Sequence, residues 1–150
     1  MKELEVVAGI ILHEGKVLCT QRDKSKFEYV SYKFEFPGGK VELSESLIEA
    51  LERELLEEME LQVEVIDEAP YLTVHHTYPD FLIHMHAFRC RTHELVYQLH
   101  DHVDAKLLPV SDLLQLDWAP ADVPIVEKLM REACAINQCR FEVDECTDVT

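Results

Sequence analysis

The segment from Gly39 to Leu61 constrains the fold of this chain more than any other part of its sequence. It reads GKVELSESLIEALERELLEEMEL and directly continues the Pro37-Gly38 step, where the backbone must turn sharply. From Ser46 onward, apolar residues recur at the spacing of one helical face, and Ser46 with Glu49 has the pattern of a capping box. The sequence therefore predicts an amphipathic helix that begins just after a glycine-rich turn.

The polar side of this helix brings three glutamates together. Glu54, Glu57 and Glu58 project within about 100° of one another at helical spacing. Like charges at these spacings repel, and the repulsion grows when carboxylates are removed from water. A divalent cation offsets it, because Mg²⁺ prefers oxygen ligands and is usually held by one or two carboxylates with substrate phosphates. The spacing indicates a metal site, whereas the remaining glutamates of the helix are interpreted as solvent-exposed charges.

At these residues the chain resembles the Nudix hydrolase family, whose box is G-x5-E-x7-R-E-U-x-E-E-x-G-U, with U a bulky aliphatic residue. The matching residues are Gly39, Glu45, Arg53, Glu54, Leu55, Glu57, Glu58 and Leu61. Glu60 stands where the family has glycine, so the turn that ends the helix needs a left-handed glutamate at a cost of about 1 kcal/mol. Through FEFPGGKVE at 34–42 and WAPADVPIVEKL at 118–129, the chain is most similar to MutT-type members.

The resemblance implies an α/β (α+β) fold of the Nudix type, an α/β/α sandwich with a mixed β-sheet, a catalytic loop-helix and a C-terminal helix. The final helix is expected at about 122–136, with Asp122 as a capping residue. Residues 1–140 are expected to form one Nudix domain and 141–150 an acidic tail, for which disorder is one expectation. The apolar and alternating runs predict strands at 4–12, 16–20, 62–66, 71–76, 81–90 and 105–110.

The resemblance also implies the metal ligands. Gly38, Glu54, Glu57 and Glu58 are expected to bind Mg²⁺, with Mn²⁺ as a substitute, so that water attacks a phosphorus of the substrate. Glu54 is expected in addition to orient or deprotonate that water. Metal ions suit this chemistry because they neutralise phosphate charge and lower the pKa of bound water.

Further catalytic and supporting roles follow from the same match. Arg53 is expected to hold a carboxylate of the site in place. A late loop of MutT-type enzymes supplies one more acidic group, for which Asp101 is the first choice and Asp104 the alternative. Glu45 supports the joint between loop and helix or assists the metal site, and the two readings have equal weight.

The residues that bind the nucleoside are less sharply predicted. Arg22, Phe27, Gly39 and Asp122 are expected to contact the substrate, whereas Trp118 is expected to pack in the core rather than stack on a base. By the resemblance, Asp122 occupies the position where enzymes specific for oxidised guanine carry asparagine. An ionised aspartate only accepts hydrogen bonds. This favours donors such as the N4 amine of cytosine, although the N1–H and N2 amine of guanine also satisfy it.

The expected reaction is hydrolysis of a nucleoside triphosphate to a monophosphate and pyrophosphate. The leading substrates are modified nucleotides of the 8-oxo-dGTP type, which would make the chain a nucleotide-pool cleansing enzyme, and CTP or 5-methyl-dCTP come second. Nucleoside diphosphate sugars, dinucleoside polyphosphates and ADP-ribose stay open, because the box fixes the reaction but not the leaving group. A non-catalytic nucleotide-binding module is the alternative from another class.

Composition excludes several other functions. The formal charge of -16 and the lack of a basic cluster argue against nucleic acid as a partner. No apolar stretch is long enough for a membrane span, so a cytoplasmic monomer or homodimer is expected. The five cysteines lack the spacing of a zinc site. His84 and His86, with His76 and His93 placed beside them, are interpreted as a polar face lining the cleft, and a second histidine site is the less favoured alternative. The pair His100 and His102 is interpreted as surface or packing residues.

Overall fold

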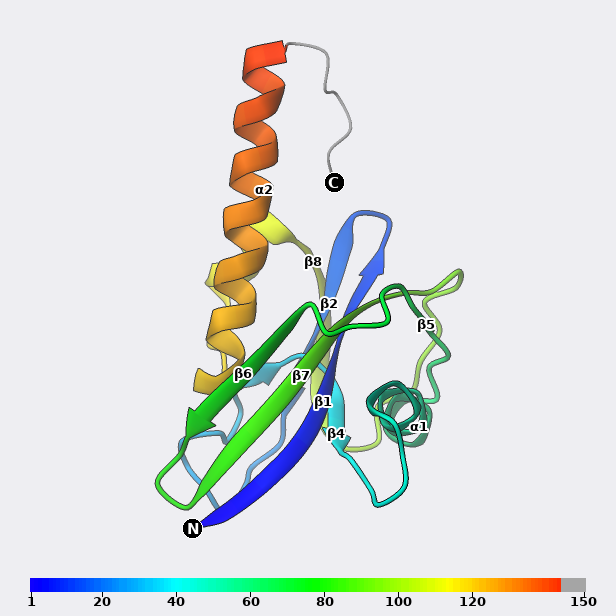
Figure 1. The fold of residues 1–150 in the computed structure, drawn as a ribbon, viewed down its shortest axis with the longest axis vertical. Coiled ribbons are helices and arrows are strands. Elements are labelled where there is room, and N and C mark those ends of the chain that lie inside the picture. Colours follow the sequence, from blue (N-terminus) through cyan, green and yellow to red (C-terminus); the bar gives the residue numbers. More distant parts are fainter. Residues whose placement is uncertain (144–150) are drawn as a thin grey trace.

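The computed structural model describes residues 1–143, with side chains as far as Ala133, and it consists of an eight-stranded mixed sheet and two long helices (Figure 1). The helices are α1 (Leu47–Met59) and α2 (Val123–Val143), and two 3₁₀ turns, η1 (Val110–Gln115) and η2 (Pro120–Asp122), precede α2. The strands are β1 (Lys2–His13), β2 (Lys16–Arg22), β3 (Phe34–Glu35), β4 (Gly38–Lys40), β5 (Glu64–Val65), β6 (Leu72–Thr77), β7 (Phe81–Arg91) and β8 (His102–Pro109).

Strand β1 organises the sheet because it pairs with three other strands. It runs parallel to β7 along nearly its whole length and antiparallel to β2 and β4. The turn between β1 and β2 is Glu14-Gly15, and both residues have positive φ, 51° and 76°. Two such residues form the type I′ turn that matches strand twist. The strands predicted at 4–12 and 16–20 therefore form a hairpin, and β6 and β8 extend the sheet through antiparallel pairing with β7 and β2.

The alternation of side chains along β1 separates two hydrophobic cores. Val7 and Ile11 pack with the apolar face of α1, whereas Ala8 and Ile10 belong to the core that includes residues of α2. Side chains of successive strand residues point to opposite faces, so one strand supplies both cores. Figure 1 shows α1 and α2 on different sides of the sheet. The predicted α/β/α sandwich with a mixed sheet is confirmed.

Helix α1 begins and ends as the sequence predicts. The Ser46 side chain accepts a hydrogen bond from the amide of Glu49, and the Glu49 side chain accepts one from the amide of Ser46. At the other end, Glu60 adopts a left-handed conformation with φ 53°. The amide of Leu61 then reaches the carbonyl of Leu55, which satisfies a carbonyl of the last turn. Position 60 therefore keeps its turn geometry without glycine.

The region around α2 departs from expectation in three ways. Asp122 lies in η2, and its carboxylate accepts a hydrogen bond at 2.9 Å from the amide of Phe36, so the predicted capping role is wrong. Helix α2 continues to Val143, seven residues beyond its expected end. The predicted tail at 141–150 thus begins inside the helix, and its residues 144–150 lie outside the described residues. No helix in residues 1–143 is long and apolar enough to cross a membrane.

Candidate active site

A cavity of about 850 Å³ opens where α1, β4, the β2–β3 loop and η2 come together. Its lining includes eight of the eleven predicted site residues, which are Arg22, Phe27, Gly38, Gly39, Glu54, Glu58, Asp101 and Asp122. These residues come from six separate stretches of the chain. We call Glu54, Glu58 and Asp101 the acidic wall of this cavity, and Phe27, Phe36, Tyr78 and Phe81 its aromatic wall.

The two glycines of β4 make room for the acidic wall. A Cβ atom on Gly39 would stand 2.3 Å from the carboxyl carbon of Glu54, and one on Gly38 would stand 1.9 Å from the carbonyl oxygen of Val7. Both distances are shorter than any non-bonded contact. Gly38 therefore lets β4 approach β1, and Gly39 lets the carboxylate of Glu54 lie against β4. The substrate-binding role predicted for Gly39 is accompanied by this structural one.

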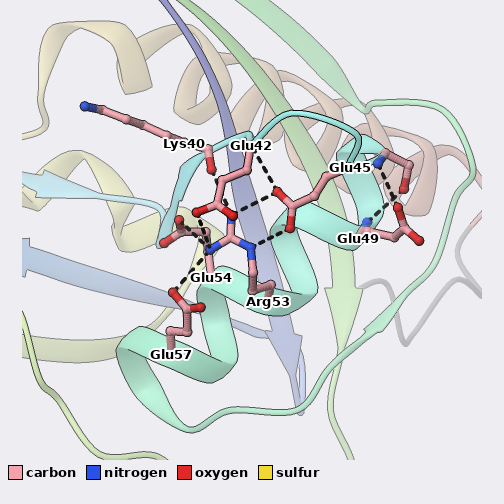
Figure 2. A network of polar contacts seen from close by, with 8 residues as sticks. Lys40, Glu42, Glu45, Glu49, Arg53, Glu54 and Glu57 are labelled. Carbon is pink, nitrogen blue, oxygen red and sulfur yellow. Dashed lines mark hydrogen bonds and ion pairs between the residues drawn. The ribbon is translucent and has the colours of Figure 1, made fainter.

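Arg53 gathers the acidic side chains at the start of α1 (Figure 2). Its Nε and Nη2 atoms donate to the two carboxylate oxygens of Glu45, and Nη2 also donates to the carbonyl of Lys40 at 3.0 Å. Its Nη1 atom contacts Glu54 at 3.1 Å and Glu57 at 3.2 Å. A planar guanidinium pairs with a carboxylate through two parallel hydrogen bonds. Arg53 is thereby held by Glu45 and in turn fixes Glu54.

Glu45 has a supporting place in this geometry. Its carboxylate faces Arg53 and the amide of Glu42 rather than the cavity. Hydrogen bonds from Arg53, reinforced by the one from the Glu42 amide, hold the pKa of Glu45 below its usual range. Of the two roles considered for this residue, the contacts favour support of the loop-helix joint.

The three predicted metal glutamates do not share one environment. Glu54 and Glu58 face the cavity, whereas Glu57 lies outside its lining, with 61 % of its side chain exposed. Glu57 stays within reach of the site through Arg53, which contacts both Glu57 and Glu54. The structure therefore brings together two of the three glutamates and places the third at the outer edge.

The acidic wall is electrostatically strained in the absence of a cation. Burial, followed by the charge of Glu54, raises the pKa of Glu58 to about 7; His102 opposes this shift, and Asp101 and Glu35 add to it. Burial also raises the pKa of Glu54, although Arg53 opposes the shift. Desolvation and like charges both disfavour the ionised carboxylate. A positive ion between these groups would relieve both costs.

The geometry also separates the two candidates for the late acidic group. Asp101 lines the cavity, and its charge is one of those acting on Glu58. Asp104 instead lies near Lys106, with 3.7 Å between Oδ2 and Nζ, and its other oxygen accepts the amide of Ala105. The position of Asp101 fits the predicted role, and that of Asp104 does not.

Glu35 and His102 are cavity residues that the sequence reasoning missed. One oxygen of Glu35 accepts from Arg22 at 3.2 Å, and the other lies 3.0 Å from Nε2 of His102. The side chain of His102 is 3 % exposed. Arg22 therefore contacts Glu35 in addition to lining the cavity. A signal for Glu35 was present in the sequence, because it stands alone between Phe34 and Phe36 in an otherwise apolar strand.

Three rings of the aromatic wall, Phe27, Tyr78 and Phe81, pack together with Tyr29, which lies outside the cavity lining. Phe27 stacks on Tyr29 with 5.4 Å between ring centroids, and Tyr29 stacks on Tyr78 at 5.0 Å. Phe81 contacts Phe27 and Tyr78 at 5.5 and 5.1 Å. Aromatic surfaces of this kind suit the flat face of a base. Phe27 thus has the position predicted for a base contact, and Tyr78 and Phe81 join it.

Asp122 and Trp118 complete this side of the site. Burial, together with the charge of Glu35, raises the pKa of Asp122 well above its usual value. The neutral carboxylic acid is favoured, and it both donates and accepts hydrogen bonds. The sequence reasoning considered only the ionised form of Asp122, which accepts but does not donate. Trp118 packs in the core as expected, stacked on Phe36 at 4.7 Å with its Nε1 donating to the carbonyl of Leu113.

The histidines are arranged differently from the prediction. His84 and His86 share a sheet face with His75, which lies directly opposite His84, whereas His76 lies opposite Ile83 on the other face. The cavity is lined by Ile83 and Met85 of β7, so His84 and His86 do not line it and that expectation is wrong. His100 contacts Glu60 at the surface at 2.7 Å. The pair His100 and His102 thus occupies two separate environments.

The donor set of the acidic wall suits a hard divalent cation. It consists of carboxylate oxygens, and His102, the nearest imidazole, already contacts Glu35. Among the side chains of residues 1–133, which the structure describes, no group of three or more His, Cys, Asp or Glu is arranged to hold a metal ion by itself. Mg²⁺ rarely uses such a cage, because it binds through one or two carboxylates, water and substrate phosphates. Two cavity-facing glutamates and a third acid fit this requirement.

Comparison with known proteins identifies the family. The model of the NUDIX domain matches residues 3–129. The chain belongs to the Nudix family. A CTP pyrophosphohydrolase of Escherichia coli is 37 % identical over 131 residues, which cover 87 % of this chain and 93 % of that protein. An 8-oxo-dGTP diphosphatase of the same species is 27 % identical over 131 residues, covering 87 % and 99 %.

Solved structures agree with the Nudix assignment. The solution structure of the MutT protein of methicillin-resistant Staphylococcus aureus, a Nudix hydrolase, superposes with a TM-score of 0.68 at 36 % identity. The match covers 88 % of this chain and 99 % of that one. The predicted enzyme class, a Nudix hydrolase acting on acid anhydrides, is confirmed, since the relatives are diphosphatases and pyrophosphohydrolases. Nudix hydrolases generally use a divalent metal ion.

Proposed function

We propose that this chain hydrolyses nucleoside triphosphates to nucleoside monophosphate and pyrophosphate with Mg²⁺ as the metal. The observation that carries the proposal is the acidic wall and the aromatic wall facing one cavity. The first wall suits a metal-bound phosphate chain, and the second suits a base. The reaction class rests on the membership in the Nudix family.

Each residue of the acidic wall has a role in this proposal. Glu54, Glu58 and Asp101 would hold the metal with the Gly38 carbonyl, and Glu57, which Arg53 links to Glu54, would add a ligand at the outer edge of the cavity. The metal supplies charge neutralisation and a water of lowered pKa. Glu54 orients or deprotonates the attacking water, because Arg53 fixes its carboxylate beside the cavity. Arg53 and Glu45 act as positioning residues through their mutual hydrogen bonds.

The charge of the cavity rim supports an anionic substrate. Five of the 14 basic residues of this chain line the cavity, namely Lys2, Arg22, Lys24, Lys26 and Lys40. The protein as a whole carries a formal charge of -16. A local group of positive charges in such a protein offsets the repulsion of a triphosphate and raises its concentration at the cavity.

For the base, oxidised purines of the 8-oxo-dGTP type are the first candidate. A neutral carboxyl group at Asp122 presents a donor beside an acceptor. The O6 and N7–H of 8-oxoguanine offer the complementary pair. The N3 and N4 amine of cytosine offer one as well, and the similarity to a CTP pyrophosphohydrolase over most of the chain favours CTP or 5-methyl-dCTP as the second candidate. The proposed biological role with the first candidate is cleansing of the nucleotide pool.

A nucleotide panel tests the proposal. The values of kcat/KM are measured with Mg²⁺ for 8-oxo-dGTP, dGTP, CTP, dCTP, 5-methyl-dCTP, ADP-ribose and a nucleoside diphosphate sugar, and the products are identified. We expect pyrophosphate and a monophosphate, with one of the two candidate bases at the top. Release of two monophosphates from a diphosphate-linked substrate as the fastest reaction would contradict it, and so would the absence of turnover on every substrate.

A further inference from the structure

Three histidines lie together on the face of the sheet that does not form the cavity. His75 of β6 stands directly opposite His84 of β7, and His86 follows on the same face two residues later. Phe88, the next residue on this face, packs with the core under α1. The cavity uses the alternate residues of β7, Ile83 and Met85. None of the three histidines lines the cavity, because they point away from the face of β7 that carries Ile83 and Met85.

Two carboxylates of β1 determine which ring nitrogen of His84 and of His86 carries the proton. Glu3 lies 2.8 Å from Nε2 of His84, and Glu5 lies 2.8 Å from Nε2 of His86. An ionised carboxylate only accepts hydrogen bonds, so each Nε2 carries the proton. In the neutral rings, Nδ1 therefore presents a lone pair towards β6. A carboxylate behind an imidazole is also the arrangement that orients histidines which bind metal ions.

The two Nδ1 atoms face different partners. Nδ1 of His86 lies 3.1 Å from the hydroxyl of Thr73, which donates a proton to it. Nδ1 of His84 lies 2.6 Å from Nδ1 of His75. Two ring nitrogens at this distance need a hydrogen atom or a cation between them, because their lone pairs would otherwise repel. In a neutral pair that hydrogen atom is carried by Nδ1 of His75. His86 is therefore a control for His84. Both rings have a carboxylate at Nε2, but Nδ1 of His86 contacts a hydroxyl group where Nδ1 of His84 contacts a second imidazole.

We propose that His75 and His84 bind a transition-metal ion such as Zn²⁺ or Cu²⁺ between their Nδ1 atoms. The ion takes the place of the shared proton, which moves to Nε2 of His75, so no net proton is released. Imidazole nitrogen suits Zn²⁺ and Cu²⁺, whereas Mg²⁺ prefers oxygen, and the site is chemically distinct from the acidic wall. Two nitrogens bound at about 2.0–2.1 Å in a tetrahedral site stand about 3.3 Å apart. The exposed ring of His75 supplies that opening by a small rotation.

The site would clip β6 to β7 beside the turn that carries the aromatic wall. His75 lies three residues before Tyr78, and His84 lies three residues after Phe81. Two protein nitrogens leave the remaining positions of the ion to water, because the described side chains, residues 1–133, contain no group of three or more potential ligands arranged around one ion. With only two protein ligands, the ion stays exposed to solvent, and its binding is measured at micromolar metal concentrations.

Electron paramagnetic resonance of Cu²⁺ added to the full chain in excess Mg²⁺ tests the proposal. We expect one ion per chain with hyperfine lines from two nitrogens, lost in His75→Ala and in His84→Ala. The matched variant His86→Ala, with the same carboxylate support, and His93→Ala should keep the signal. Glu3→Gln should weaken affinity by about tenfold, the loss typical of an outer-shell carboxylate.

Zn²⁺ alone provides a second readout that does not depend on the spectrum. Its addition should raise the melting temperature of the wild type in a saturable way, and should not do so in His75→Ala. Oxygen-only ligation of Cu²⁺, or equal Zn²⁺ stabilisation of wild type and His75→Ala, overturns the proposal. Mg²⁺-dependent nucleotide hydrolysis stays unchanged in His75→Ala, so this result is independent of the proposed function.

Discussion

The acidic wall and the aromatic wall of the cavity are built from different amounts of chain. The acidic wall comes mainly from one helix, because Glu54 and Glu58 both lie on α1, where Glu54 lies against Gly39 and contacts Arg53, and only Asp101 comes from the loop before β8. The aromatic wall needs the β2–β3 loop, the segment after β3, the β6–β7 turn and the start of β7, which meet only in the folded protein. The first wall is thus fixed by local structure and the second by the sheet.

This difference suggests a division of labour between the walls. The acidic wall holds charged groups that act on the phosphate chain, which all nucleotides share. The aromatic wall and Asp122 contact the base, which differs between nucleotides. Glu35 links the two, since its charge raises the pKa of both Glu58 and Asp122. We expect changes in the acidic wall to lower kcat for every substrate and changes in the aromatic wall to alter KM and base preference.

The largest effect is expected from Glu58→Gln. Removing one charge from the acidic wall should lower kcat on the order of 10³-fold for all nucleotides, because it removes several kcal/mol of metal-based stabilisation. Steady-state kinetics on two nucleotides with different bases measure the change. The control is Glu52→Gln, an exposed position of the same helix. Loss of activity on nucleotides with only one of the two bases would contradict the assignment of the acidic wall to the phosphate chain.

Arg53→Lys comes next. Lysine keeps the charge but cannot hold Glu45 with two hydrogen bonds while reaching Glu54. Loss of such a support typically costs 10–100-fold, so we expect kcat to fall by about that factor with KM little changed. Arg89→Lys is the control, because Arg89 also donates two hydrogen bonds to a carboxylate, both to Oδ2 of Asp67, outside the cavity. Equal effects of the two substitutions would contradict the positioning role.

Phe27→Leu probes the aromatic wall. It removes an aromatic face and keeps most of the volume, so KM should rise about tenfold, in line with about 1–3 kcal/mol for base–aromatic stacking, while kcat stays close to wild type. Tyr29→Phe, which removes only the hydrogen bond to Asp80, serves as the control. The comparison fails if Phe27→Leu lowers kcat and leaves KM unchanged.

The smallest effect concerns the stability contributed by Asp122. Burial raises its pKa in the folded protein above the value of about 4 in an unfolded chain. The folded state then binds more protons above that pH, so its contribution to stability is complete below about pH 4 and is lost as the pH rises. Asn at this position does not titrate. The melting temperature of Asp122→Asn minus that of wild type should therefore grow from pH 5 to pH 8, and a constant difference would contradict the buried neutral acid.

The same contrast explains what the sequence predicts. Helical periodicity places Glu54 and Glu58 on one side of α1, and the capping pair Ser46 and Glu49 fixes where the helix begins, so this part of the site follows from residues near in sequence. The sandwich fold was implied by the resemblance to the Nudix family, whereas the patterns of the sequence by themselves predicted only the helices and strands that build it.

Other features depend on contacts across the fold and escaped the prediction. Whether a glutamate on the polar side of α1 faces the cavity or solvent depends on β4 and Arg53, so Glu57 was grouped with Glu54 and Glu58. The role of Asp122 depends on the amide of Phe36, 86 residues away. His76 was placed with His84 and His86 because the pairing register of β6 and β7 is set by their turn and not by either strand alone.

Binding of Mn²⁺ to the acidic wall tests the central claim most directly. Mn²⁺ is titrated into the wild type and into Glu58→Gln with a non-hydrolysable nucleoside triphosphate present, and the free-ion resonance signal is followed. We predict that the wild type binds the ion at least about tenfold more tightly than the variant, since carboxylate oxygens and phosphates share its coordination. Equal affinity in both proteins would contradict the claim that Glu58 helps to hold the metal ion in this cavity.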